Sequence, residues 1–393
     1  MAINQEVYFP MSSTPLSSLK THFGQVHDPR AQHSIDHPLL DIMLITICAV
    51  ICGADSWVEV ENYGIAKQEW LATFLELPHG IPSHDTIERL FARLRPEELQ
   101  QCFVTWVQSV FEISGGQLIA VDGKTLRGSY ERGGKRAMIH MVSAWATQNR
   151  IVLGQRKVNE KSNEITAIPE LLKVLDLDGA MVSIDAMGCQ TVIAAKIVEQ
   201  NGDYVLALKG NQGDMFEDVV QLFEQARQQS FSGIEHDYYE TQEQGHGGIE
   251  TRRYWLMGNT DYLVGAENWA KLTTIGCVES QRYVGDILVC ETRYYLLSLP
   301  LDAARFAAAV RGHWGIENQL HWILDVAFRE DESRVTAGYS GQNLAVIRHI
   351  ALNLLAQESS AKGGTHAKRL KAGWDDQYLL KVMAQGKCTA GAV

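Results

Sequence analysis

The sequence predicts a mixed α/β protein: a central sheet with helices on both faces, an all-helical region before it and a β-rich insertion within it. Three observations indicate this fold class. Residues 37–111 carry a helical pattern of apolar positions. From Gln117 onward, short apolar runs alternate with segments of helix length. Residues 231–298 are rich in the β-branched and aromatic residues that favour strands.

The helices of the N-terminal region are predicted from their first residues. Pro38–Val50 is apolar on all sides, as expected of a buried helix. Ser56 precedes a second helix and has Glu59 at the capping-box spacing. Ser83 starts a helix that resembles the second helix of a helix-turn-helix, and Pro96 starts the last one. Because this region is acidic, protein contact or packing on the catalytic domain is indicated at least as strongly as DNA reading.

The middle of the chain is predicted to form the central sheet. The expected elements are strands at 117–122, 137–147, 151–158, 180–184 and 204–208, with helices at 164–175 and 191–200 between the later strands. Three antiparallel strands followed by alternating helices and strands give a ribonuclease-H-like layout. We therefore expect a helical domain over 1–115 and a catalytic domain over 116–393, interrupted by a β-rich insertion at about 213–298. The apolar helix around residues 343–355 is expected to pack against the sheet.

Two apolar runs each end in an aspartate. Leu118–Val121 leads into Asp122, and a similar run from Ala180 leads into Asp185. Buried strands avoid unpaired charge, so an acid at the end of one is usually hydrogen-bonded, paired or bound to a cation. Two such carboxylates side by side favour Mg²⁺ or Mn²⁺ between them. The alternative is that each Asp simply begins a turn.

Bulk composition excludes several classes of protein. No apolar run reaches the length of a membrane span, so no membrane partner is expected. Seven scattered cysteines and the lack of a secretion signal at the start of the sequence indicate a reducing, cytoplasmic setting. The net charge is −12, but the segments around the two aspartates and near the C-terminus are the least acidic. Lys124 and Arg127 follow the first aspartate closely and are candidates for phosphate contact.

A third group of polar residues lies downstream, at His313, Glu317 and His321. Their spacing places them on one face of a helix expected over Asp302–Val326. Glu317 is therefore the predicted third acid, in preference to Asp325. The same three residues leave a zinc site open as an alternative, although the metalloprotease order His-Glu-x-x-His is absent.

These motifs together resemble a known family. Asp122-Gly-Lys-Thr, Ile184-Asp185-Ala and the long stretch from Arg311 to Asp331 are similar to DDE transposases of bacterial insertion sequences, in the H-repeat-associated branch found with Rhs elements. The resemblance covers nearly the whole chain. It implies a ribonuclease-H-like core and a catalytic, metal-binding triad of Asp122, Asp185 and Glu317. It further implies cleavage and strand transfer of DNA with two Mg²⁺ or Mn²⁺ ions.

The chain departs from the wider family around Glu317. Where that family carries Tyr, Arg and Lys, this sequence has Val310, His313 and Leu324. The imidazoles of His313 and His321 are candidates to replace the missing DNA contacts. The predicted DNA-binding set is Lys124, Arg127, Lys209, Arg252, His313, Asn318 and His321.

The expected partners follow from the same resemblance. They are double-stranded DNA, as terminal inverted repeats and as target, and a second copy of the chain in the working complex. A bacterial cytoplasmic location is expected, with nucleoid association when DNA is bound. Two other functions stay open from the residues: a catalytically silent relict that binds DNA or a partner, and a structure-selective nuclease.

Overall fold

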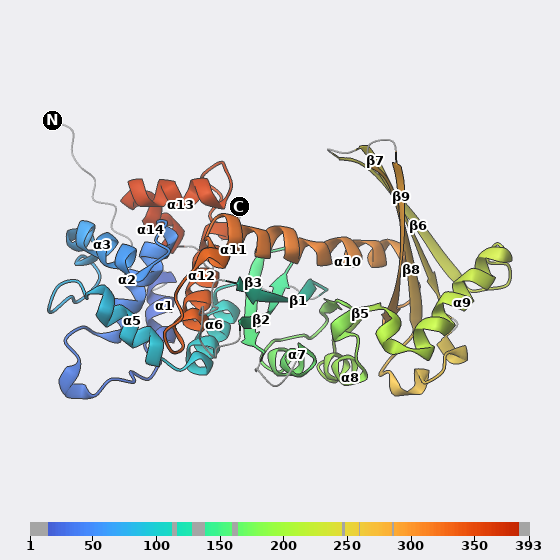
Figure 1. Cartoon of the computed structure of the whole chain (residues 1–393), viewed down its shortest axis with the longest axis horizontal. Helices are drawn as coiled ribbons and strands as arrows, with labels where there is room; N and C mark the ends of the chain where they lie inside the picture. The colour runs from blue at the N-terminus through green and yellow to red at the C-terminus, as the bar shows by residue number, and fades with distance from the viewer. Residues whose placement is uncertain are drawn as a thin grey trace, which may run out of the picture. The chain divides into compact units, whose positions relative to one another are not determined.

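The computed structural model describes residues 15–111, 116–127, 138–158, 164–245, 248–258, 260–284 and 287–384. Within these ranges the protein is a mixed α/β structure with a large sheet and many helices (Figure 1). The chain forms two compact units. Among the described residues, one unit comprises 15–111, 126–127, 138–139 and 322–384, and the other comprises 116–125 and the described part of 140–321. Residues 322–384 belong to the same unit as the N-terminal helices. The domain division expected at residue 115 stays a prediction.

The first unit is helical. Its elements are α1 (Pro15–Phe23), η1 (Gln32–Ser34), α2 (Leu39–Ile51), α3 (Trp57–Ala66), α4 (Gln68–Leu71), α5 (His84–Arg93), α6 (Pro96–Val110), α11 (Trp322–Val326), η8 (Glu330–Glu332), α12 (Ser340–Gln357), α13 (Thr365–Trp374) and α14 (Asp376–Met383). Serine caps begin α3 and α5 as predicted: Ser56 forms a full capping box with Glu59, and Ser83 accepts from the Thr86 N–H. Pro96 is the first residue of α6, also as predicted.

The position of α12 corrects the sequence prediction that this helix packs on the sheet. It packs on α2, and also on α5, α6, α13 and α14. The physical reason lies in α2, which is buried along nearly its whole length and apolar all round. A helix of that kind needs other helices on every side, and α12 provides one of them.

The second unit contains the sheet. Its first five strands are β1 (Leu118–Leu126), β2 (Ile139–Ala146), β3 (Ile151–Lys157), β4 (Met181–Ile184) and β5 (Asp203–Leu208), in the order β3-β2-β1-β4-β5. β4 is parallel to both β1 and β5, and β2 pairs antiparallel with β3. Each predicted strand and the hairpin are confirmed, with ends shifted by a few residues.

The predicted β-rich insertion is confirmed, and it extends the same sheet. After α9 (Asp214–Gln228) come β6 (His236–Gly245), β7 (Gly248–Met257), β8 (Thr274–Val284) and β9 (Ile287–Leu297). The short turn η4 (Gly210–Gln212) precedes α9, and η5 (Thr260–Tyr262) and η6 (Ala266–Asn268) lie between β7 and β8. β9 pairs antiparallel with β5, which gives a sheet of nine strands. The insertion therefore starts where the first five strands end.

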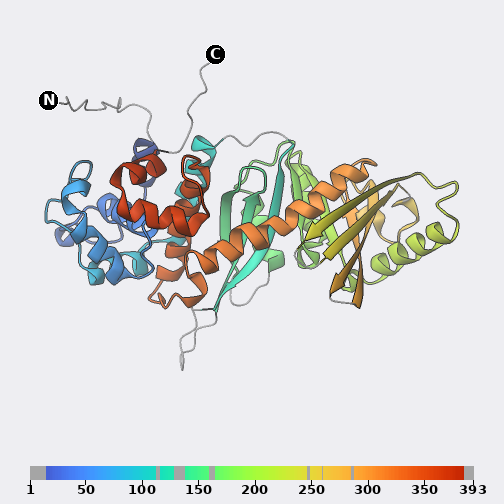
Figure 2. The same ribbon diagram turned by 90° about the horizontal axis from the view of Figure 1, so that it is seen from above.

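Helices cover both faces of the sheet. On one face, α7 (Glu164–Leu172) contacts β3 and α8 (Thr191–Glu199) contacts β5. On the other, α10 (Ala303–Gly315) runs across the strands and contacts β4, β5, β6 and β7 (Figure 2). Phe306 of α10 is fully buried among apolar side chains of the sheet. Gly312 permits close packing, because a Cβ there would lie 2.3 Å from Leu118.

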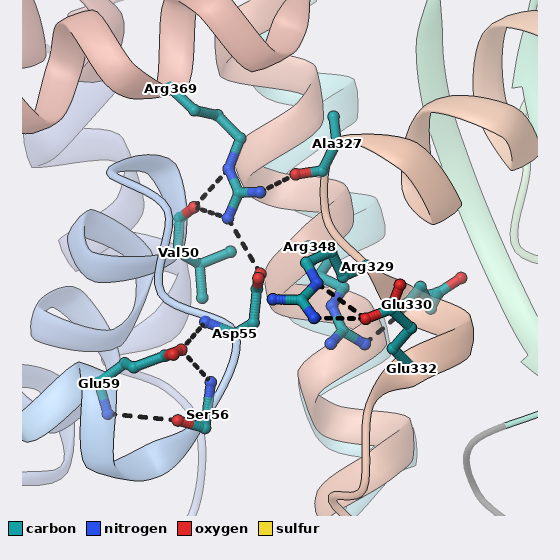
Figure 3. A network of polar contacts seen from close by, with 10 residues as sticks. All are labelled: Val50, Asp55, Ser56, Glu59, Ala327, Arg329, Glu330, Glu332, Arg348 and Arg369. Atoms are coloured by element: carbon teal, nitrogen blue, oxygen red, sulfur yellow. Dashed lines mark hydrogen bonds and ion pairs between the residues drawn. The ribbon is translucent and has the colours of Figure 1, made fainter.

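Arg369 ties three segments of the helical unit together (Figure 3). Its guanidinium donates to the Val50 carbonyl at 3.1 and 2.9 Å and to the Ala327 carbonyl, and it pairs with Asp55 at 3.2 Å. It also lies 4.3 Å from the centre of the Phe328 ring. Because Arg369 is almost fully buried, its removal leaves carbonyl groups and a carboxylate without their partner.

We predict that Arg369→Ala lowers the free energy of unfolding by about 3 kcal/mol, the typical cost of breaking a buried ion pair. Urea denaturation followed by circular dichroism would measure it. Arg329→Ala is the control, since Arg329 pairs with Glu332 at the surface, where an ion pair contributes little to stability. Equal losses for the two variants would contradict the role given to Arg369.

Candidate active site

The sheet brings Asp122 and Asp185 together. β1 and β4 pair in parallel, with Val121 opposite Ile184, so the next residue of each strand is an aspartate. The carboxyl ends of parallel neighbours meet at one edge of a sheet. The Asp185 side chain also accepts from the N–H groups of Met187 and Gly188, at 3.1 and 3.3 Å, and so caps the turn η3 (Ala186–Gly188). The predicted adjacency of the two strands is confirmed.

Asp122 has an unusual protonation equilibrium. Burial raises its pKa to about 7, and the charges of Asp185, Glu317 and Glu164 act in the same direction. The backbone N–H of Gly123 opposes the rise only in part. A carboxylate surrounded by other carboxylates takes up either a proton or a cation. The cluster at this edge therefore has the electrostatic character of a cation site.

Glu317 lies in a distorted stretch of helix. After α10 the chain forms a π-helix, η7 (Ile316–His321), where a continuous α-helix over Asp302–Val326 was expected. Asp302 caps the start of α10 as predicted and accepts from the Arg305 N–H at 2.9 Å. A π-helix has a wider turn than an α-helix and is frequent at functional sites. Glu317 is the second residue of this π-helix, and its negative charge helps to raise the pKa of Asp122.

The two histidines on either side of Glu317 contact the strands that carry the aspartates. The His313 ring bonds to the Ser183 hydroxyl on β4 through Nδ1 at 3.0 Å, and burial lowers the pKa of this imidazole. His321 Nδ1 lies 3.5 Å from Asp122 Oδ2. The two imidazoles therefore face different strands, so they do not converge on Glu317 as a zinc site would require.

A cleft of 340 Å³ lies beside the acids. Asp185, His313 and Glu317 line it, together with Lys209, which follows β5. Arg293 and Tyr294 of β9 and Trp314 of α10 also line the cleft. The guanidinium of Arg293 stacks 4.8 Å from the centre of the Trp314 ring. Sequence reasoning did not single out Arg293 and Tyr294, because their place depends on the pairing of β9 with β5.

The other predicted DNA-binding residues lie in several environments. Lys124 is on β1, two residues after Asp122, and Asn318 is exposed on η7. Arg127 is largely exposed and lies 3.6 Å from Asp331. Arg252 is buried and pairs with Glu243 and Glu250, at 3.1 and 2.5 Å. Its guanidinium is thus already bound within the protein, and its contact with DNA stays a prediction, as do the other contacts of the set.

The donor chemistry fits Mg²⁺ or Mn²⁺. Carboxylate oxygens are the ligands these ions prefer, and the mutual repulsion around Asp122 is what a bound cation would relieve. In the described part of the chain, no three acidic, imidazole or thiol groups already stand at ligand distance from one point.

No helix among the described residues is long and apolar enough to cross a membrane.

Acidic groups gathered around neighbouring strands, as Asp122 and Asp185 are here, are typical of enzymes that act on phosphate esters through divalent cations. The sequence profile of the family described as "Transposase DDE domain" matches residues 113–354, and that of the "DDE_Tnp_1-associated" family matches residues 20–107. The chain therefore belongs to the DDE transposase family.

Individual relatives agree with this assignment. The chain is 41% identical to the "Putative transposase YncI" of Escherichia coli O157:H7, over 94% of this chain and 95% of that protein. It is 39% identical to the "H repeat-associated putative transposase YhhI" of Escherichia coli strain K12, over 94% and 98%. A cryo-EM structure of the piggyBac transposase synaptic complex with hairpin DNA is 12% identical in sequence and has a TM-score of 0.42, over 94% of this chain and 81% of that one. At that TM-score the likeness carries no conclusion.

The raised pKa of Asp122 makes a prediction about the metal-free protein. An aspartate titrates near pH 3.9 in the unfolded chain and at about 7 here, so the folded state holds the extra proton between those values. The stabilisation that Asp122 contributes through this proton is therefore complete below about pH 4 and is lost as the pH rises to about 7. Asp122→Asn removes this dependence. We expect the free energy of unfolding of the variant, minus that of the parent, to rise by on the order of 2–4 kcal/mol between pH 4 and pH 8.

Urea denaturation in the presence of chelator, at a series of pH values, would measure this difference. The other titrating groups are common to both proteins, so the contributions of those that do not interact with Asp122 cancel. A difference between variant and parent that does not change with pH would contradict the assigned environment of Asp122.

Proposed function

We propose that this protein is an active DDE-type transposase that cuts and joins DNA at Asp122, Asp185 and Glu317. The observation that carries the proposal is the pairing of β1 with β4, which sets two aspartates side by side within reach of the charge of Glu317. The strand order β3-β2-β1-β4-β5, with helices on both faces, supports a ribonuclease-H-like core. The family assignment supports the same reaction class.

The proposed chemistry is an in-line displacement at a phosphodiester. Divalent cations held by the three carboxylates would supply Lewis-acid activation of the attacking oxygen and stabilise the leaving one. The protein's own part is to hold Asp122 and Asp185 next to the paired residues of β1 and β4, and Glu317 on η7. With a lowered pKa, His313 is neutral near pH 7 and serves as a hydrogen-bonding group. Water as nucleophile nicks the element end, and a 3′-hydroxyl joins that end to target DNA.

DNA would approach along the cleft. Lys209 is well placed for a backbone phosphate because it lines the cleft with Asp185 and Glu317. Phosphate contacts fix the register of DNA without reading bases. Lys124, Asn318 and His321 lie on the elements that carry the acids and are proposed as further contacts. Arg127 and Arg252 belong to the same proposed set.

The remaining assignments are parts of the same proposal. Residues 116–393 would be the catalytic domain and residues 1–115 the associated helical domain. The substrates would be double-stranded terminal repeats and target DNA, handled by a homodimer in the bacterial cytoplasm and at the nucleoid. A silent relict and a structure-selective nuclease are the competing functions, and the assay below separates all three.

We predict that Asp185→Asn and Glu317→Gln lower metal-dependent cleavage by at least about a hundredfold, because each keeps side-chain volume and removes a charge that holds the cation. Asp325→Asn is the matched control and should stay within about threefold, since no role is assigned to it. The substrate would be linear DNA carrying the gene's own flanking sequences, incubated with Mg²⁺ or Mn²⁺, and the products would be mapped on sequencing gels.

Cleavage at defined element ends, followed by joining, is the expected result, and chelator should abolish it. Cleavage without end preference would favour the nuclease, and tight DNA binding without cleavage would favour the relict. Full activity with Zn²⁺ alone, or an Asp325→Asn loss larger than that of Glu317→Gln, would overturn the triad.

A further inference from the structure

A fourth carboxylate lies beside the proposed triad. Glu164, the first residue of α7, packs against the backbone of Gly123, the residue that follows Asp122. A Cβ built on Gly123 would stand 2.1 Å from Glu164 Oε1 and 2.7 Å from His140 Nε2. No side chain fits at that distance, so glycine at position 123 is what allows the Glu164 carboxylate to reach this place.

Glu164 is held there by a chain of hydrogen bonds. His140 on β2 bonds to Glu164 Oε1 through Nε2 and to the Thr125 hydroxyl through Nδ1, the latter at 2.8 Å. Thr125 lies on β1, three residues after Asp122. These hydrogen bonds thus connect β1, the strand that carries Asp122, to the start of α7. It fixes the direction of Glu164, because both ring nitrogens of His140 have partners.

The charge of Glu164 acts on Asp122, as the charges of Asp185 and Glu317 do. An ordinary structural salt bridge would need only His140 and Glu164, and it would be better placed away from other acids. Here the pair lies where negative charge is already in excess, which costs stability in the absence of a cation. Residues that surround the ligands of a metal site, without binding the metal themselves, orient the ligands and add charge in this way.

We propose that Glu164, aligned by His140 and Thr125, is a fourth acidic group of the site and a positioning residue that strengthens divalent-cation binding through its charge. This inference rests on the proposed function, since it assumes that Asp122 and Asp185 hold the cation. The sequence alone did not single out Glu164, because its distance from Asp122 depends on how β1, β2 and α7 meet.

The test is Mn²⁺ binding to the full-length protein by isothermal titration calorimetry, together with thermal unfolding in chelator. Glu164→Gln keeps the shape of the side chain and removes its charge. We expect it to bind Mn²⁺ about tenfold more weakly, with a metal-free melting temperature equal to or above that of the parent. Glu170→Gln is the control, because Glu170 is on the same helix but pairs with Lys173 at the surface. Its Mn²⁺ affinity and its metal-free melting temperature should both match those of the parent.

The outcomes separate the two proposals. Parent-like Mn²⁺ affinity in Glu164→Gln would overturn the inference. A weaker affinity accompanied by a lower metal-free melting temperature would overturn it too, because that pattern belongs to a structural salt bridge. Asp185→Asn is measured alongside. Loss of Mn²⁺ binding in Asp185→Asn supports the cation site of the proposed function whatever Glu164 does, and unchanged binding there would refute that site.

Discussion

The parallel pairing of β1 with β4 is the constraint on which the rest of the site depends. Both strands are buried over the paired residues, so a charge within the pairing would be costly to desolvate. Asp122 and Asp185 come directly after the last paired residues, Val121 and Ile184. The apolar runs thus fix the register, and the register brings two carboxylates to one edge. The effect of the Asp185 charge on the pKa of Asp122 follows from that register.

Much of this arrangement was predictable because the signals are local. An apolar run that ends in an aspartate shows both the strand and the acid, and the cap residues Ser56, Ser83 and Asp302 mark where helices begin. The alternation of helices with strands then limits β1, β4 and β5 to a parallel arrangement. The sequence offered the adjacency of the two aspartates as a hypothesis, and the pairing of β1 with β4 supports it.

Features that depend on distant pairing were not predictable. The π-helix at Glu317 has no sequence signal of its own, and the regular spacing of His313 and His321 pointed to an α-helix. The cleft wall at Arg293 exists only because β9 pairs with β5. The grouping of α12 with the N-terminal helices depends on the need of α2 for apolar neighbours. Glu164 lies 42 residues from Asp122 along the chain, and only the folded sheet and α7 bring its charge near.

The most direct measurement is anomalous X-ray diffraction at the manganese edge from crystals soaked in Mn²⁺. It locates the cation without relying on activity or on knowledge of the DNA substrate. The account predicts a peak within about 2.3 Å of carboxylate oxygens of Asp122 and Asp185, with Glu317 on the same ion or on a second ion about 3.5–4 Å away. A Mn²⁺ ion held only by His313 or His321, or a strong peak elsewhere with none at the two aspartates, would contradict it.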